Sequence, residues 1–240
     1  MTMGRAFEVR KSSMEKTSVE KSKIYSRFGR EIYQAAKNGS TEIKSNPQLK
    51  SLIEKAKKLQ VPNSIINKAI DKAKSGIDEN YINVKYECFG TAGALYIVEG
   101  LTNNVNRTIA EVRHCLNKSE GKVGVSGSVD HMFLHRGRFL IEEHIEDKIL
   151  EIIVDNDIDA VEIEAINNSF LISVEQHNYS YTKAKLEEIL GKKLLSSGLI
   201  YVPINEISLS EDVDKINHQK IINSLSELED VMNIYHNIKQ

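Results

Sequence analysis

Basic side chains are the residues of this sequence whose type and spacing most clearly predict a chemistry. The first 76 residues contain 17 Lys and Arg but only 7 Asp and Glu, a local net charge of +10. Because the whole chain of 240 residues sums to −2, residues 77–240 carry −12. A charged partner responds to charges within about 8–10 Å rather than to the average over the molecule. The N-terminal third is therefore predicted to contact phosphate.

Three helical patterns must position these basic residues. Apolar residues recur at helical spacing in 24–36, 49–56 and 66–73. The boundaries are residues typical of helix caps and stops: Gly39, Asn46 with Pro47, Pro62 and Gly76. We expect a three-helix domain over residues 21–78 and, before it, a flexible basic arm over residues 1–20 that lacks apolar periodicity.

The basic residues fall mostly outside the apolar stripes and are expected in solvent. A charged exterior is ordinary for a small bundle, but it normally interleaves both signs of charge. The excess of positive charge therefore favours polyanion contact over solvation alone. The predicted nucleic-acid-binding residues of the arm and the helices are Arg5, Arg10, Lys11, Lys21, Lys23, Arg27, Arg30, Lys50, Lys57, Lys58, Lys68 and Lys72.

From residue 80 the spacing of the apolar residues changes from the one typical of helices to the one typical of strands. Strands are predicted over 84–89, 94–101 and 128–134, with a helix over 107–118. Residues 136–205 follow the strand, helix, strand, strand, helix, strand order of a ferredoxin-like domain. Its predicted elements are 138–141, 144–154, 161–166, 170–174, 180–190 and 199–204. A helix over 211–228 and a strand over 231–238 are left to complete the earlier unit.

The predicted fold class is therefore α+β. An N-terminal three-helix bundle is followed by two ferredoxin-like α/β domains, one inserted in the other. The predicted divisions are the arm 1–20, the helical domain 21–78, a discontinuous α/β domain of 79–135 plus 205–240, and the inserted domain 136–204.

Several motifs with metal-binding or nucleotide-binding character each lack a required residue. The Gly-rich segment 121–127 has no Lys-Ser/Thr pair for a phosphate loop. Residues 155–166 begin like a calcium loop but lack its Gly and its final Glu. No carboxylate or thiol is spaced to complete a zinc site with His131, His135 and His144. We predict no metal, no cofactor and no catalytic residues.

Cellular location follows from composition. The chain has no stretch of about 18 apolar residues and no secretory apolar segment, so we expect a cytoplasmic protein without a membrane partner. Cys88 and Cys115 fit no metal spacing, and both lie in predicted ordered elements. They are predicted to be reduced and structural.

Residues 101–117, LTNNVNRTIAEVRHCLN, add two basic candidates outside the helical domain. Asn103 and Asn104 can cap the helix, which leaves Arg107 and Arg113 on its polar side. A guanidinium there can hold a phosphate or a carboxylate in a fork, or form an ordinary surface ion pair.

The chain resembles the YebC family over nearly its whole length. The matching strings, in order, are MGRAFE, KIYSRFGREIYQAAKNG, NPQLKSLIEKAKKLQVPNSIINKAIDKAKSG, LTNNVNRTIAEVRHCLNK, GS before VDHMF, and IYHNI. The chain departs from the family pattern at Cys88 and His131, and has only Glu229 and Asp230 where members carry a run of Asp. The family's fold, a helical domain followed by two α/β domains, is the one predicted above.

The resemblance implies a regulator of gene expression that binds nucleic acid and is not an enzyme. It favours a transcriptional regulatory protein that binds double-stranded DNA. The alternative is a translation factor that binds ribosomal RNA on the ribosome and relieves stalls at proline-rich sequences. A scaffold whose acidic α/β surface binds basic proteins is the third possibility. The sequence does not fix the oligomeric state.

Overall fold

The chain forms two compact units. The computed structural model describes residues 3–76, 81–142, 146–166 and 169–239, without the side chains of 3–20, 146 and 192. One unit comprises Met1–Tyr86, Val98–Lys118 and Gln219–Ile234, and the other comprises Glu87–Ile97, Ser119–His218 and Tyr235–Gln240. Along the described residues, no helix combines the length and apolar character needed to cross a bilayer.

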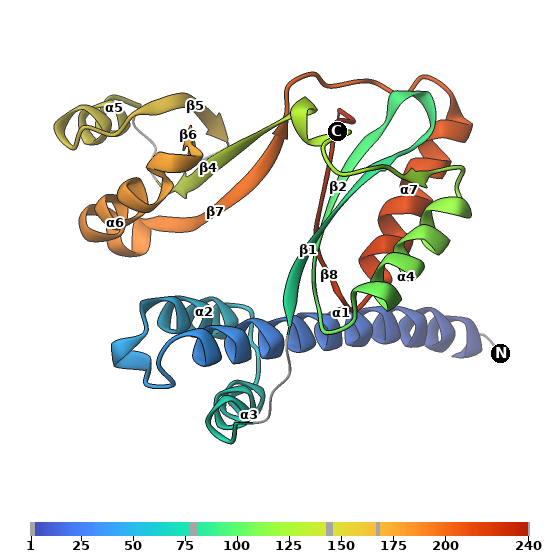
Figure 1. The fold of residues 1–240 in the computed structure, drawn as a ribbon, viewed down its shortest axis with the longest axis horizontal. Coiled ribbons are helices and arrows are strands. Elements are labelled where there is room, and N and C mark those ends of the chain that lie inside the picture. Colours follow the sequence, from blue (N-terminus) through green and yellow to red (C-terminus); the bar gives the residue numbers. More distant parts are fainter. Residues whose placement is uncertain (1–2, 77–80, 143–145, 167–168, 240) are drawn as a thin grey trace. The chain divides into compact units, whose positions relative to one another are not determined.

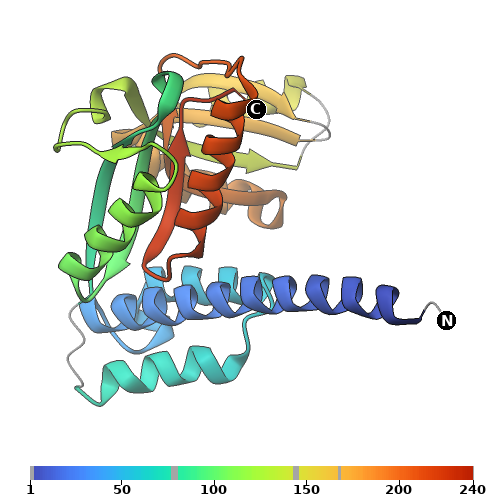
Figure 2. The same cartoon turned by 90° about the vertical axis from the view of Figure 1, so that its right-hand side faces the viewer.

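The N-terminal part of the first unit is helical, as predicted. It contains α1 (Met3–Asn38), the 3-10 turn η1 (Ile43–Ser45), α2 (Pro47–Lys58) and α3 (Asn63–Lys74). Figures 1 and 2 show α1 continuing well beyond the part that α2 and α3 accompany.

Residues 3–20 differ from the predicted arm, because they are the first half of α1. This segment has no glycine or proline between Gly4 and Gly29 and is rich in Lys, Arg, Glu and Met. These residues have good intrinsic helix propensity, so the helix continues without an apolar stripe.

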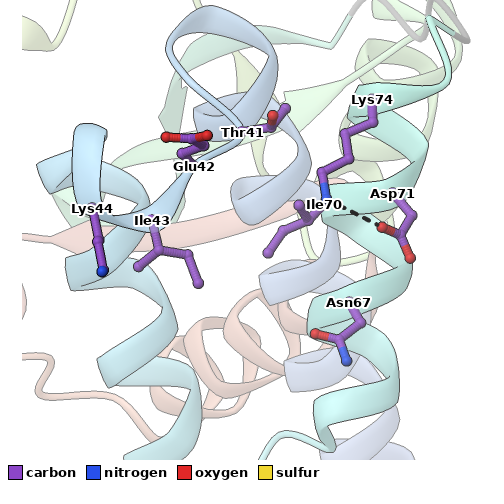
Figure 3. Close-up of a pocket in the computed structure, with 8 residues that line it drawn as sticks. All are labelled: Thr41, Glu42, Ile43, Lys44, Asn67, Ile70, Asp71 and Lys74. Atoms are coloured by element: carbon purple, nitrogen blue, oxygen red, sulfur yellow. Dashed lines mark ion pairs between the residues drawn. The ribbon is translucent and has the colours of Figure 1, made fainter.

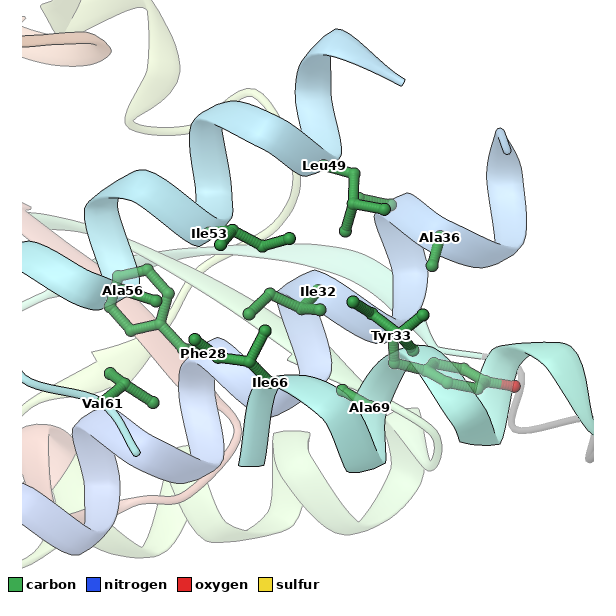
Figure 4. Packing of buried hydrophobic residues seen from close by; sticks show 12 residues of the cluster. Phe28, Ile32, Tyr33, Ala36, Leu49, Ile53, Ala56, Val61, Ile66 and Ala69 are labelled. Carbon is green, nitrogen blue, oxygen red and sulfur yellow. The ribbon is translucent and has the colours of Figure 1, made fainter. Parts of the chain in front are cut away.

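One apolar core joins the three helices. Phe28 and Ile32 of α1, Ile53 of α2 and Ile66 of α3 are almost completely buried. Figure 4 shows side chains from all three helices meeting in this core, with Val61 from the α2–α3 connection. The apolar stripes of the sequence therefore face one another, and the other sides of α2 and α3 are left for charged residues.

Asn46 fixes the path from α1 into α2. Its Oδ1 accepts a hydrogen bond from Leu49 N at 3.0 Å and so caps α2, while its Nδ2 donates to Ala35 O and Ser40 O at 2.9 and 2.8 Å. A Cβ at position 39 would lie 2.8 Å from Asn46 Nδ2, so only the glycine found there leaves room. The predicted stop at Gly39 and cap at Asn46 are confirmed as parts of one turn.

The first sheet combines distant parts of the chain. Its strands are β1 (Ile82–Phe89), β2 (Leu95–Thr102), β3 (Lys122–Val123) and β8 (Val231–His236), in the order β3-β1-β2-β8. The associated helices are α4 (Val105–Asn117) and α7 (Asp212–Glu227), and the 3-10 turn η2 is Thr91–Gly93. The last strand of the chain therefore joins the strands that follow the helical domain.

The predicted strand over 128–134 is wrong for most of its length. Residues 130–132 form the 3-10 turn η3 (Asp130–Met132), and only Phe133 and Leu134 begin a strand. Glu87 causes this, because its buried carboxylate accepts hydrogen bonds from the backbone N–H groups of Gly127, Val129 and Asp130. Those groups cannot then join a β ladder.

The second sheet has the ferredoxin-like order predicted for the inserted segment. The helices and strands are β4 (Phe133–Ile141), α5 (Glu146–Asp155), β5 (Ala160–Ile166), β6 (Ser169–Glu175), α6 (Tyr179–Leu190) and β7 (Leu194–Pro203). The short 3-10 turns are η4 (Gln176–Asn178) and η5 (Gly191–Lys193). The strand order is β5-β6-β4-β7, and β4 pairs antiparallel with both β6 and β7.

Apolar residues of this sheet and of α5 and α6 form one core. Phe139 of β4, Ile149 of α5, Ile172 of β6 and Leu186 of α6 are fully buried. The α+β class with N-terminal helices and two four-stranded sheets is confirmed. The four domain limits given by the sequence stay a prediction.

Asn46→Ala should lower the free energy of unfolding by about 2 kcal/mol, because it removes a helix cap and leaves two carbonyl groups without a donor. Asn46→Asp keeps the cap acceptor but places a buried carboxylate oxygen against the carbonyls of Ala35 and Ser40, so its loss should be at least as large. Asn63→Ala, at an exposed position of α3, is the control. Urea unfolding of the three variants measures the order, and equal stability of N46A and N63A would contradict it.

Candidate nucleic-acid interface

Exposed lysines occupy the outer sides of α2 and α3. The helical period that buries Leu49, Ile53 and Ala56 turns the intervening lysines of α2 away from the core. Predicted contact residues that are exposed in the structure are Lys21, Lys50, Lys57, Lys58, Lys68, Arg107 and Arg113. Lys72 is half-buried instead, because its ammonium lies 5.8 Å from the centroid of the Tyr33 ring. The predicted contacts Arg5, Arg10 and Lys11 lie outside the described side chains.

A groove beside these helices has no net charge. It has a volume of about 820 Å³ and lies between η1 and α3, as Figure 3 shows. Lys44 and Lys74 line it together with Glu42 and Asp71, and Lys74 pairs with Asp71 at 3.7 Å. Because these charges cancel, the groove does not favour a polyanion, and the positive charge of the helical domain lies elsewhere.

Three predicted contact residues on α1 bind the chain's own C-terminal part. Lys23 Nζ donates to Ser226 O at 3.1 Å, and Arg27 Nη1 donates to Met232 O at 3.1 Å. Arg30 donates to the carbonyl of Glu229 and to the carboxylate of Asp230. Arg27, expected in solvent from the sequence, is therefore only partly exposed, and its Nε also pairs with Glu31 Oε1 at 3.0 Å. We call Lys23, Arg27 and Arg30 the α1 basic stripe and residues 226–232 the docking segment.

Arg30 and Asp230 form a buried ion pair in the first unit. Arg30 Nη1 lies 2.8 Å from Asp230 Oδ1, and their side chains are only 8% and 4% exposed. Burying either charge alone would be costly, so each requires the other. Arg30 is thereby a structural residue, and in this arrangement it is not accessible to phosphate.

Asp230 also binds the start of α4. Its Oδ2 accepts hydrogen bonds from Thr102 Oγ1 at 2.9 Å, Thr108 Oγ1 at 2.7 Å and Arg107 Nη2 at 2.7 Å. A Cβ at Gly100 would lie 2.8 Å from Asp230 O, so the glycine permits this close approach of β2. Burial raises the pKa of Asp230, but these three hydrogen bonds and the charge of Arg107 outweigh it and hold the pKa below its ordinary value.

Arg107 is the exposed end of this network. Its side chain is 47% exposed, although Nη2 is held by Asp230. The hydrogen bond and the charge of Asp230 raise the pKa of Arg107. Asn104 caps α4 as predicted, because its Oδ1 accepts from Arg107 N at 3.0 Å. The guanidinium is thus oriented by a carboxylate on one side and open to solvent on the other.

The candidate metal and thiol residues take structural positions. In the described part of the chain, no group of three His, Cys, Asp or Glu could hold a metal ion. His131 contacts Gly127 O through Nδ1, and His144 lies outside the described residues. Cys88 and Cys115 are buried and free, and burial raises the pKa of the Cys88 thiol to about 12.

The sequence reasoning missed Asp230 and the threonines that bind it. Asp230 lies 122 residues from Thr108 and 200 from Arg30, so no local pattern links them. The Glu229-Asp230 pair before the last strand was visible, but nothing adjacent indicates that one carboxylate is buried and the other exposed.

Asp230→Asn should lower the free energy of unfolding by about 3 kcal/mol at pH 7, because the buried Arg30 loses its counter-charge. The folded-state pKa of Asp230 lies below its ordinary value of 3.8, so its stabilising effect is present above that value and is lost as the pH falls through the folded pKa. The stability difference between wild type and variant should therefore narrow below about pH 4.

Asp212→Asn is the control, because Asp212 is exposed and pairs only at the surface with Lys215. Denaturant unfolding at several pH values measures both differences. A wild-type advantage over D230N that is as large at pH 2 as at pH 7 would exclude the carboxylate charge as its cause.

Comparison with known proteins places this architecture in a family. The model for the TACO1/YebC N-terminal domain matches residues 5–76, and that for the TACO1/YebC second and third domains matches residues 81–238. A "probable transcriptional regulatory protein" of Acholeplasma laidlawii is 45% identical over 239 residues, with 98% of each chain covered. A protein of the same description from Alcanivorax borkumensis is 43% identical over 240 residues, covering 98% of this chain and 99% of its own.

A solved structure agrees with this assignment. The crystal structure of a conserved hypothetical protein from Aquifex aeolicus has a TM-score of 0.76 and 29% sequence identity. The match covers 91% of this chain and 90% of that one. The sequence matches span both the helical domain and the two sheets, and the structural match covers most of the same chain. The chain therefore belongs to the TACO1/YebC family.

Proposed function

We propose that this protein is a non-enzymatic regulator of gene expression that binds double-stranded DNA through the phosphate backbone. The helical domain makes the contact, and the acidic remainder of the chain limits indiscriminate binding. The role is binding alone and requires no catalytic group.

The exposed lysines of α2 carry the proposal. Lys50 and Lys57 are seven residues apart, so they lie on the same side of the helix about 10 Å apart along its axis. Lys58 lies beside them, and Glu54 is the one acidic side chain of α2. Such spacing allows one helix to contact several phosphates of a strand.

The aromatic residues of the helical domain favour a duplex over a single strand. Phe28 and Tyr33 are buried in the core, and Tyr25 packs against it. Proteins that bind single-stranded nucleic acid usually stack bases on exposed aromatic rings. The described surface of α1 to α3 has lysines in place of such rings, so phosphate contact without base stacking fits it better.

The names of the relatives support the regulatory part. The relatives from Acholeplasma and Alcanivorax are described as probable transcriptional regulatory proteins. The charge distribution, +10 in residues 1–76 and −12 in residues 77–240, supports a single nucleic-acid-binding end.

A translation factor that binds ribosomal RNA is the second candidate. The observation that favours it is the same lysine surface, because backbone contacts serve an RNA duplex as well as a DNA duplex. Competition between a DNA duplex and purified ribosomes for the labelled protein separates the two candidates. The proposal of DNA binding requires that the duplex, at equal phosphate concentration, displaces the ribosomes.

The variant K50A/K57A/K58A should bind a DNA duplex more weakly and with a smaller salt dependence. The slope of log K against log salt should fall in magnitude by about 0.9 for each lysine that contacts a phosphate. Fluorescence anisotropy at several salt concentrations measures the slope. The variant K148A/K220A/K239A removes three exposed lysines from the acidic part and should keep the wild-type slope. Equal slopes for the two triple variants would exclude α2 as the contact surface.

A further inference from the structure

We infer that the docking segment competes with phosphate for the α1 basic stripe. We also infer that the Glu229 carboxylate repels polyanions of low charge density from the stripe. This inference rests on the proposed function and adds to it a regulated second contact surface on α1.

The stripe has the geometry of a phosphate-binding face. Lys23, Arg27 and Arg30 are spaced four and three residues apart, so their side chains leave one side of α1. All three donate hydrogen bonds to the docking segment, and Ser26 between them donates to Glu229 Oε1 at 2.6 Å. The segment thus covers the part of α1 where phosphates would otherwise bind.

Two of the three contacts are exchangeable. Lys23 Nζ and Arg27 Nη1 donate to main-chain carbonyls, which are uncharged acceptors. Arg27 Nε is held separately by the carboxylate of Glu31 at 3.0 Å, and the Arg27 side chain remains 40% exposed. A phosphate oxygen carries negative charge, so it adds to the hydrogen bond a Coulomb attraction that a main-chain carbonyl lacks. A phosphate that reaches Lys23 or Arg27 therefore offers a better acceptor than Ser226 O or Met232 O.

Arg30 is the permanent contact. It is buried and is bound by the carboxylate of Asp230. Displacing that carboxylate would leave the buried Arg30 without its counter-charge, and Arg30 is too deeply buried for a phosphate to replace it. Arg30 therefore keeps the docking segment attached while the other two side chains exchange their acceptors.

The carboxylate of Glu229 supplies the repelling charge. Its side chain is 71% exposed and lies 4.0 Å from Arg30 Nη1, in contact with Ser26. A carboxylate in this position repels an approaching phosphate and lowers the positive potential of the stripe. Polyanions of high charge density overcome this repulsion, whereas those of low charge density are kept from the stripe.

Glu229→Gln tests the effect of this negative charge alone, because Gln can still accept the hydrogen bond from Ser26. The matched control is Glu188→Gln, which removes the same charge from an exposed position on α6, outside the docking segment. E229Q should bind a short DNA duplex about three- to fivefold more tightly than E188Q. In the Lys23→Gln/Arg27→Gln background this advantage should disappear, because both exchangeable cations are gone.

Side-chain NMR tests the exchange directly. On titration with the duplex, the Nη–H signals of Arg27, which donates to Met232 O through Nη1, should shift while those of Arg30 stay in place. Equal affinities of E229Q and E188Q, or no shift of the Arg27 Nη–H signals in a saturated complex, would overturn the inference. Failure of the wild-type protein to bind DNA at all would instead refute the proposed function, so the two outcomes are distinct.

Discussion

The buried carboxylate of Asp230 holds together the elements of the first unit that are farthest apart in sequence. It binds Arg30 of α1, Thr102 at the end of β2, and Arg107 and Thr108 at the start of α4. Four hydrogen-bond donors converge on the two carboxylate oxygens, and they keep Asp230 ionised although it is buried. The position of the chain before β8 is thereby fixed relative to α1.

This network divides the cationic side chains into two classes. Arg30 is buried and bound to Asp230, whereas Lys50, Lys57 and Lys58 face solvent on α2. Arg107 is intermediate, since it is bound on one side and exposed on the other. Net charge counts the buried and the exposed side chains alike. Only the exposed ones can neutralise phosphates without a change in structure.

How far the sequence predicts this molecule depends on how local the determining contacts are. The start of α2 at Asn46 and Pro47 follows from adjacent residues, and the strand order of the inserted domain follows from its period and turns. The loop held by Glu87 and the pairing of Arg30 with Asp230 depend on contacts 40 or more residues apart, so they were missed. Of the predicted interface, the exposed α2 lysines agree with the structure, while the stripe on α1 proves to be occupied.

The separation of Arg30 from Asp230 has a consequence for biosynthesis. Their 200 residues take roughly 10–40 s to synthesise at about 5–20 residues per second. The core of the helical domain uses partners within residues 24–81 and can assemble much earlier. During that interval Lys23, Arg27 and Arg30 have no docking segment to bind. The nascent chain is therefore most cationic while it is still attached to the ribosome, whose surface is rich in RNA.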